Sequence, residues 1–267
     1  MQGAPEPFLP QDTPSQAERT DYEAQLRAAP DYLEFARSLV AAARAGDHAA
    51  QFYIFRALEY CTVEYRFHFG GRGRRTLDDA LKWAATHFPY DSETVRLVYA
   101  RCHTFVESGA KDLGKRGEWL RLASDGGYPL AQVNAAKRQK LEGVSAAGDE
   151  AARYEESLRL VSLAIRSREP AVMWEVGNSL FKDADTDSEG DVDDLAWLYA
   201  ACLRGFDCTA QSDAVRDLCR YDPNCQPYES VADVFRRARG NDFPALEADA
   251  GWINEKLDAG DWEALGF

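Results

Sequence analysis

The sequence predicts an all-α fold, and three observations lead to that prediction. Apolar residues recur at helical spacing, as in Leu33, Ala36 and Val40. Helix-start signals recur along the chain, as where Asp31 is followed three residues later by Glu34 in the spacing of a capping box. Alternating apolar and polar runs joined by hairpin turns are absent from the sequence, so strands are not predicted.

Five segments share one pattern, in which a helix ends in small residues and a short turn leads into a second helix. In chain order they are residues 41–57, 78–102, 118–136, 157–176 and 196–214. The alanines that begin the second helix, Ala131, Ala171 and Ala210, follow one another at intervals of 40 and 39 residues. Ala50 lies 81 residues before Ala131, which leaves room for the 78–102 copy. Because one helix pair cannot bury its apolar face alone, we expect the pairs to stack as an α-solenoid.

Start signals place the individual helices within these copies. Thr20, with an acid three residues later, has capping-box spacing, and Thr76 and Ser92 stand directly before the helical segments 77–83 and 93–100. Pro129 and Pro170 follow the turns of later copies, and proline's missing N–H costs nothing in the first turn of a helix. Each copy is therefore predicted to contain two helices.

Two stretches carry a pattern of small residues that resembles a known family. Residues 70–85 (GGRGRRTLDDALKWAA) match its loop and second helix, with Arg74 where valine is usual. Residues 189–210 match it better, although the Ala–Trp spacing is shortened, at Gly190, Val192, Asp194, Ala196, Trp197, Ala200, Ala201, Gly205 and Ala210. Over roughly residues 31–225 the chain resembles Sel-like repeat proteins, which are relatives of tetratricopeptide repeats.

This resemblance implies a right-handed α-solenoid of about five Sel-like helix–turn–helix repeats with a C-terminal capping helix. Members of the family usually act as adaptor or scaffold proteins, and many bacterial ones are exported. Some are immunity proteins that neutralise a secreted toxin. The implied function is therefore binding to a protein.

The chain divides into three predicted parts. Residues 1–15 are polar and proline-rich, and we expect a flexible lead-in or a remnant left after a signal sequence is removed. Residues 16–225 form the predicted repeat solenoid, and residues 226–267 form its C-terminal cap and acidic tail. Trp252 and Trp262 lie in this last part, where we favour a role in closing the core of the last helix over a role in partner binding.

The net charge of −14 is concentrated in two windows. Residues 183–194 hold seven acids and no base, and residues 242–263 hold seven acids against one base, Lys256. Because phosphates would meet like charge, nucleic acid is not a predicted partner. The windows instead predict a protein partner with a basic surface, and ordinary solvated loops are the alternative. The candidate partner-binding residues are Asp185, Asp187, Glu189, Asp191, Asp193, Trp252, Asp258, Asp261 and Trp262.

Part of the first window resembles an EF-hand calcium loop. In residues 185–196 (DTDSEGDVDDLA), acids stand at positions 1, 3, 5 and 9 and a glycine at position 6. Position 12, which must supply the bidentate carboxylate, is Ala196, and the repeat pattern requires that alanine for packing. We therefore predict a turn between helices, and no metal or other cofactor.

Six cysteines bear on the cellular compartment. Cys202, Cys208, Cys219 and Cys225 lie within 24 residues in the pattern C-x5-C-x10-C-x5-C, which is too widely spaced for most structural zinc sites. Disulfides fit better and predict a periplasmic or secreted protein, with reduced cysteines in a cytoplasmic protein as the alternative. Cys61 and Cys102 lie at similar depths in adjacent copies and form a further candidate pair, by stacking of first helix on first helix.

Little in the sequence points to catalysis. No H-E-x-x-H pair, nucleophile elbow or phosphate-binding loop accompanies the four histidines, which are His48, His68, His87 and His103. A basic segment with Arg66, Arg72, Arg74 and Arg75 is interpreted as an exposed loop, with an anion site as the alternative.

The sequence thus favours a non-catalytic protein-binding solenoid of the periplasm or exterior, with an immunity protein as its most concrete form. The alternative is a scaffold for a cell-envelope or signalling assembly, and an enzyme ranks third. No apolar run is long enough to span a membrane. The oligomeric state is left open.

Overall fold

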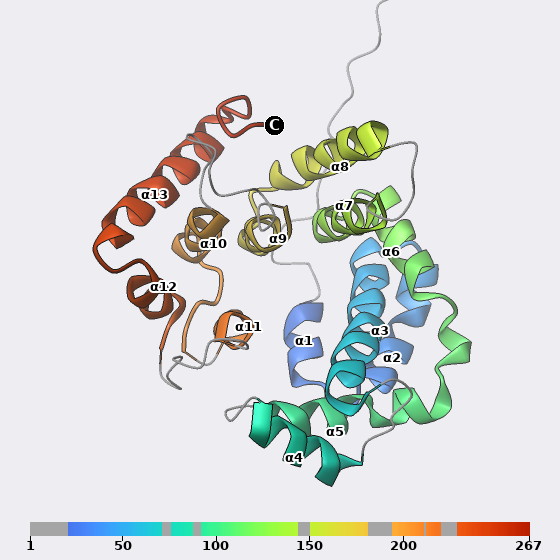
Figure 1. The fold of residues 1–267 in the computed structure, drawn as a ribbon. Helices are drawn as coiled ribbons and strands as arrows, with labels where there is room; N and C mark the ends of the chain where they lie inside the picture. Colours follow the sequence, from blue (N-terminus) through green and yellow to red (C-terminus); the bar gives the residue numbers. More distant parts are fainter. Residues whose placement is uncertain are drawn as a thin grey trace, which may run out of the picture.

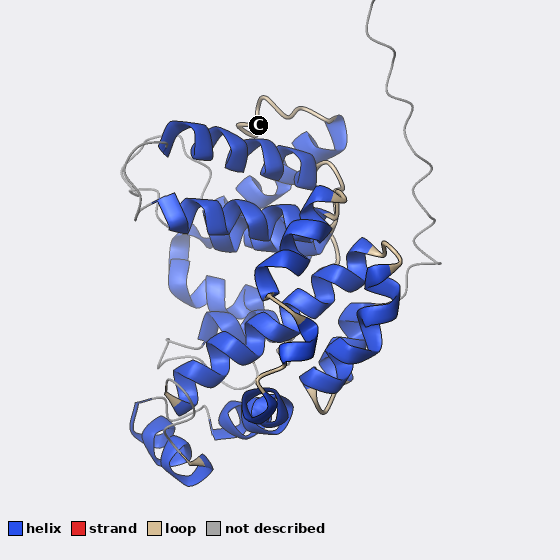
Figure 2. Ribbon diagram, turned by 90° about the vertical axis from the view of Figure 1, so that its right-hand side faces the viewer, coloured by secondary structure: helices blue, strands red, loops and turns tan. Residues whose placement is uncertain are grey.

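A computed structural model of the chain describes residues 21–70, 76–87, 92–143, 150–180, 194–210, 212–219 and 229–267. Within these ranges every regular element is helical and no strand occurs (Figure 2), which confirms the predicted all-α class. The α-helices are α1 (Tyr22–Ala28), α2 (Tyr32–Arg44), α3 (His48–Phe69), α4 (Leu77–His87), α5 (Ser92–Ser108), α6 (Arg116–Asp125), α7 (Pro129–Gly143), α8 (Glu150–Ile165), α9 (Pro170–Leu180), α10 (Asp194–Leu203), α11 (Asp213–Cys219), α12 (Val231–Arg239) and α13 (Phe243–Ala259).

Aspartates start the first three helices by accepting hydrogen bonds from otherwise unpaired backbone N–H groups. The Asp31 carboxylate accepts from the N–H groups of Leu33 and Glu34 at 2.8 and 3.2 Å, which confirms the start expected there. Asp47 caps α3 and also accepts from the Tyr22 hydroxyl at 2.8 Å, so that one carboxylate fixes both α3 and α1. The start expected at Thr20 lies outside the described residues, and Asp21 is the N-cap of α1.

Helices that follow one another in sequence pack as antiparallel neighbours through most of the chain. The pairs α2–α3, α6–α7, α7–α8 and α9–α10 make the most extensive of these contacts, and α13 covers α10 (Figure 1). The α4–α5 hairpin departs from this sequence of layers. It lies across one end of α3, while α6 returns to pack on α3 directly (Figure 1). The chain path therefore places α6, α7 and α8 side by side.

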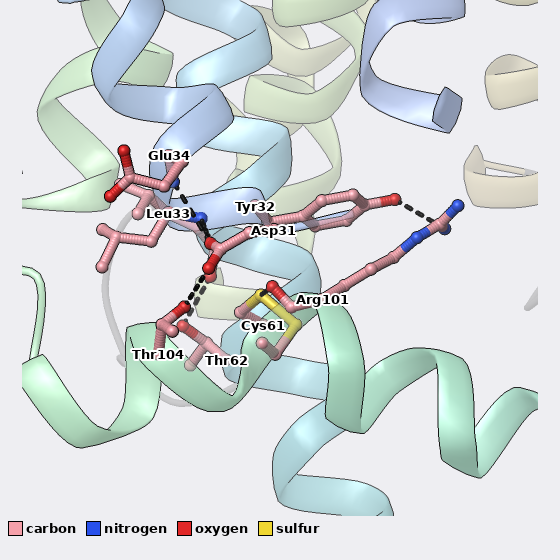
Figure 3. The surroundings of a disulfide bond; sticks show 10 residues. Asp31, Tyr32, Leu33, Glu34, Cys61, Thr62, Arg101 and Thr104 are labelled. Carbon is pink, nitrogen blue, oxygen red and sulfur yellow. Dashed lines mark hydrogen bonds between the residues drawn. A yellow bond between two sulfur atoms is a disulfide. The ribbon is translucent and has the colours of Figure 1, made fainter. Parts of the chain in front are cut away.

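A disulfide and two polar contacts hold the α4–α5 hairpin in place (Figure 3). Cys61 on α3 is joined to Cys102 on α5 with a Cα–Cα distance of 5.1 Å, which confirms this candidate pair. Both cysteines lie on the second helix of a pair and not, as expected, on the first. The Arg101 side chain donates to the Tyr32 hydroxyl at 2.9 Å, and the Thr104 hydroxyl donates to Asp31 at 2.6 Å. The carboxylate that caps α2 thus also anchors α5.

The apolar core runs through the helix layers. Phe52, Ile54 and Phe55 of α3 are buried in one half, and Trp197 of α10 is buried in the other. Ala196 is also fully buried in α10, in agreement with the packing role assigned to it. The rest of the calcium-like loop, residues 185–193, lies outside the described residues.

Candidate functional site: a groove between α6 and α8

An open hollow of about 620 Å³ lies between α6 and α8, with α7 as its floor. The helices α6 and α8 are the first helices of two consecutive pairs, and α7 packs against both of them (Figure 1). Leu120 comes from α6, Gln132 and Arg138 from α7, and Leu160 and Leu163 from α8. Three helices therefore contribute side chains to one concave surface, which is the usual form of a binding site.

Local sequence features explain why the three helices meet in this way. α6 ends at Asp125 with Gly126 as its C-cap, and Gly127 has the positive φ of 81° that the turn needs before Pro129 starts α7. α8 is tied to α7 by the buried Ser157 hydroxyl, which donates to the backbone carbonyl of Ala136 at 3.3 Å. These contacts fix the floor and one wall of the groove relative to each other.

The charged side chains of the groove form paired groups on the two walls. Arg121 on α6 contacts Asp125 at 2.7 Å, and Arg159 on α8 donates to both carboxylate oxygens of Glu156 at 2.6 Å. The hydrogen bonds from Arg159 lower the pKa of Glu156 below its ordinary value, so the pair stays charged at neutral pH. With Arg138 the lining has three arginines and two acids, a net +1 in a chain of net −14.

An apolar strip accompanies these charges. Leu120 and Leu160 are buried beneath the groove, whereas Leu163 is 41% exposed and stands on the α8 wall. A ligand that covered Leu163 would gain from removing its side chain from water, and three arginines line the same hollow. The geometry therefore suits a segment with both apolar and carboxylate groups.

Of the two acidic windows, the second lies within the described residues, together with Asp194 of the first. Asp185, Asp187, Glu189, Asp191 and Asp193 lie outside the described residues. In the second window Asp258 contacts Arg204 at 2.9 Å and Asp261 contacts Lys256 at 2.9 Å, so these acids already have cationic partners within the chain.

The two candidate tryptophans are both partly buried against the core. Trp252 is approached by Lys256, whose Nζ lies 6.0 Å from the ring centroid. Trp262 is approached by Arg166, whose Cζ lies 5.9 Å from the ring centroid. Both tryptophans therefore lie against the core, as a role in closing the core of the last helix requires.

The histidines are spread over separate helices. His48 starts α3 and its Nδ1 lies 3.0 Å from Gln51 Oε1, whereas His68 is buried near the other end of α3. His103 on α5 lies 3.1 Å from Glu107, and His87 is in α4. In the part of the chain that the structure describes, no three His, Cys, Asp or Glu side chains are grouped as metal ligands. Of the basic segment, Arg66 is exposed on α3, and Arg72, Arg74 and Arg75 lie outside the described residues.

The clustered cysteines begin at Cys202 on α10 and continue through Cys219 on α11. Cys202 and Cys208 form a second disulfide, with a Cα–Cα distance of 5.6 Å. Cys219 is also disulfide-bonded, and Cys225 lies outside the described residues. Disulfides of this number are typical of an oxidising compartment.

The groove residues were not foreseen from the sequence. Their only signal is the pairing of Arg121 with Asp125 and of Glu156 with Arg159 at helical spacing, and that pairing also occurs on ordinary exposed helices. Among the described helices, none is long and apolar enough to cross a membrane. Comparison of the chain with protein-family models, curated proteins and solved structures finds no match.

Proposed function

We propose that this protein is a non-catalytic protein-binding module whose groove between α6 and α8 holds a segment of its partner. The observation that carries the proposal is the groove itself, an open concave surface built by two first helices over a shared second helix. The chemistry of the walls favours a segment that carries carboxylates beside an apolar side chain. The basic partner surface expected from residues 183–194 stays a separate prediction.

The same proposal includes the finer architecture, a right-handed solenoid of about five Sel-like repeats with a C-terminal cap. Its support is the succession of helix pairs and the burial of Ala50 and Ala131 near the starts of α3 and α7. The α4–α5 hairpin is the repeat that departs from regular stacking, because α6 packs on α3. α13 packs over α10, which supports a terminal cap formed by α12 and α13.

We assign the protein to the periplasm or the cell exterior. The disulfides of α3–α5 and of the α10–α11 loop support an oxidising compartment. An immunity protein that neutralises a secreted toxin is the most concrete form of this function, and it depends on the resemblance to Sel-like repeat proteins.

Site-specific photocrosslinking tests the proposal. A photoreactive phenylalanine analogue is placed at Leu163 in the groove and, as the matched control, at Tyr154. Tyr154 is 62% exposed on the same helix, nine residues away and thus about half a turn out of phase. In extracts of the producing cells we expect a protein adduct from position 163 and not from position 154. Adducts of equal yield from both positions would contradict the groove as the site.

The captured partner then allows a quantitative test in purified form. Leu163→Glu places a third carboxylate in the groove and should weaken binding at least tenfold, because it repels the carboxylates of the docked segment. Tyr154→Glu adds the same charge on the opposite flank and should leave the affinity unchanged. Equal losses in the two variants would point to general charge repulsion and against the groove.

A further inference from the structure

The loop that follows α10 is a small ring closed by the Cys202–Cys208 disulfide, with six residues of sequence separation. Its residues hold the C-terminal helices. Arg204 contacts Asp258 on α13 at 2.9 Å, and the backbone carbonyl of Cys208 accepts from the N–H of Val231, the first residue of α12, at 3.1 Å. Both ends of the cap are therefore fixed to this ring.

The same ring reaches two further helices. Phe206 stacks on Trp174 of α9, with ring centroids 4.9 Å apart and an interplanar angle of 20°. Asp207 lies 3.6 Å from Arg27, which belongs to α1 near the start of the described chain. Four residues of one short loop thus contact α1, α9, α12 and α13, and the disulfide closes that loop.

The two described disulfides differ in access to solvent. Cys61 and Cys102 are 1% and 0% exposed and lie between packed helices. Cys202 and Cys208 are both half-buried, and the neighbouring Leu203 is 55% exposed. Thiol–disulfide exchange requires in-line approach of a thiolate to a disulfide sulfur, so accessible disulfides react first. Of the two described disulfides, only Cys202–Cys208 is accessible to an attacking thiolate.

We infer that Cys202–Cys208 is a thiol–disulfide exchange site for a dithiol, and that its reduction loosens the attachment of α12 and α1. One thiolate of the dithiol attacks a sulfur of the pair, the S–S bond breaks, and the other cysteine leaves as a thiolate that takes up a proton. The second thiol of the reagent then attacks the mixed disulfide and releases the first cysteine. The protein disulfide gains two electrons, and the dithiol is oxidised to its own disulfide.

The consequence is local because other contacts of α13 do not involve the ring. The Asn254 amide donates to the carbonyl of Ala200 at 3.3 Å, and the Tyr199 hydroxyl donates to Glu247 at 3.3 Å. These bonds keep α13 on α10 after reduction. The segments that lose a restraint are α12, at Cys208, and α1, at Asp207, while the Tyr22–Asp47 hydrogen bond still holds the start of α1. This inference is independent of the groove and of its partner.

Graded reduction of the full chain tests it. The protein is treated with increasing dithiothreitol, quenched with N-ethylmaleimide and mapped by peptide mass spectrometry. We expect Cys202 and Cys208 to be labelled at least ten times faster than Cys61 and Cys102. Simultaneous labelling of all four, or earlier labelling of Cys61 and Cys102, would overturn the assignment of the exchange site.

Amide hydrogen exchange on the partly reduced wild-type chain tests the consequence. Exchange should rise in residues 22–28 and 231–239 while residues 48–69 stay as protected as in the oxidised protein. The variant with both Cys202→Ser and Cys208→Ser should show the same pattern without any reductant. Unchanged exchange in both segments, in the reduced protein and in the variant, would refute the loosening.

Discussion

Gly126 at the end of α6 lies directly against the imidazole ring of His48 at the start of α3. A Cβ added to Gly126 would come within 2.2 Å of His48 Nδ1, a distance that real Cβ atoms do not show. The backbone of Gly126 has φ −76°, which every residue type adopts, so the requirement for glycine is purely one of space. The contact lies where α6 packs on α3.

Replacing Gly126 with alanine should therefore destabilise the protein by about 1 kcal/mol, the low end for overpacking, because the exposed His48 side chain can turn aside. Urea denaturation followed by circular dichroism measures this loss. If the cause is the His48 ring, the additional change His48→Ala should recover most of the stability lost by Gly126→Ala. Independent, additive effects of the two changes would show that the ring is not the obstacle.

The adjacent Gly127 provides the control for this interpretation. Nothing lies within 4 Å of an added Cβ there, but its φ of 81° is in the left-handed region. Gly127→Ala should cost about 1–2 kcal/mol through backbone conformation alone. His48→Ala should leave that cost unchanged, because no side chain is involved.

Two glycines within helices predict opposite effects of the same substitution. An alanine Cβ at Gly177 on α9 would lie 2.9 Å from Trp197 Cβ and 3.1 Å from the Asp194 carbonyl oxygen, and neither atom can move without shifting α10. Gly177→Ala should cost about 1–3 kcal/mol. Gly251 in α13 has open space around it, so Gly251→Ala should stabilise the protein by about 0.5–1 kcal/mol. Thermal denaturation of both variants checks the two signs, and a loss of stability in both would contradict the comparison.

These contacts also show what the sequence could predict. Helical periodicity and caps such as Asp31 act over a few residues, so the all-α class and the helix starts follow from local chemistry. The Cys61–Cys102 pair was predicted from similar depths in two adjacent copies, but the helices that carry it are the second ones and not the first ones expected. The contact of Gly126 with His48 joins residues 78 positions apart, and no sequence motif near either residue predicts it.

The groove could not be predicted for a similar reason. A helical pattern shows which face of α8 is apolar, but the chain path decides which flank of the helix stays uncovered. Here the α4–α5 hairpin lies across one end of α3, and α6 occupies the surface that regular stacking would have given to α4. Leu163 is exposed because of that chain path. The helical spacing of the apolar residues around it does not predict this exposure.

The two described disulfides should contribute unequally to global stability. In the chain-entropy account a crosslink stabilises by restricting the unfolded chain, and the effect grows with the length of chain enclosed. A separation of 41 residues for Cys61–Cys102 corresponds to about 4 kcal/mol at 25 °C. A separation of 6 residues for Cys202–Cys208 corresponds to about 2 kcal/mol.

Double Cys→Ser variants of each pair, compared by urea denaturation, measure this difference. The Cys61→Ser, Cys102→Ser protein should lose about twice as much stability as the Cys202→Ser, Cys208→Ser protein. A larger loss from the short ring would show that its contacts with α1, α9 and α12 support the whole fold, and chain entropy would then not be the main effect.

Buried tyrosines predict how stability responds to alkaline pH. Burial is the main cause that raises the pKa of Tyr53, Tyr60 and Tyr32 above the ordinary value of 10.0, and for Tyr32 the Arg101 guanidinium partly opposes the increase. In the unfolded chain these hydroxyls titrate near pH 10. The stability that depends on their neutral form is fully present below about pH 10 and is lost as the pH rises above it.

Above about pH 10 such a tyrosine is ionised in the unfolded chain and neutral in the folded protein. Each one should therefore lower the free energy of unfolding by about 1.4 kcal/mol per pH unit. Urea denaturation between pH 8 and 11 measures that slope. The part of the tyrosinate absorbance near 295 nm that Tyr53→Phe removes should appear together with the loss of helical signal. Tyr53→Phe keeps the ring of a side chain that is 5% exposed and removes its ionisable group, so its slope should be shallower. Tyr154→Phe changes an exposed ring and should leave the slope as it is. If the wild type forms more tyrosinate than Tyr53→Phe while the helices of both remain intact, the Tyr53 hydroxyl ionises in the folded state and its burial is not what limits alkaline stability.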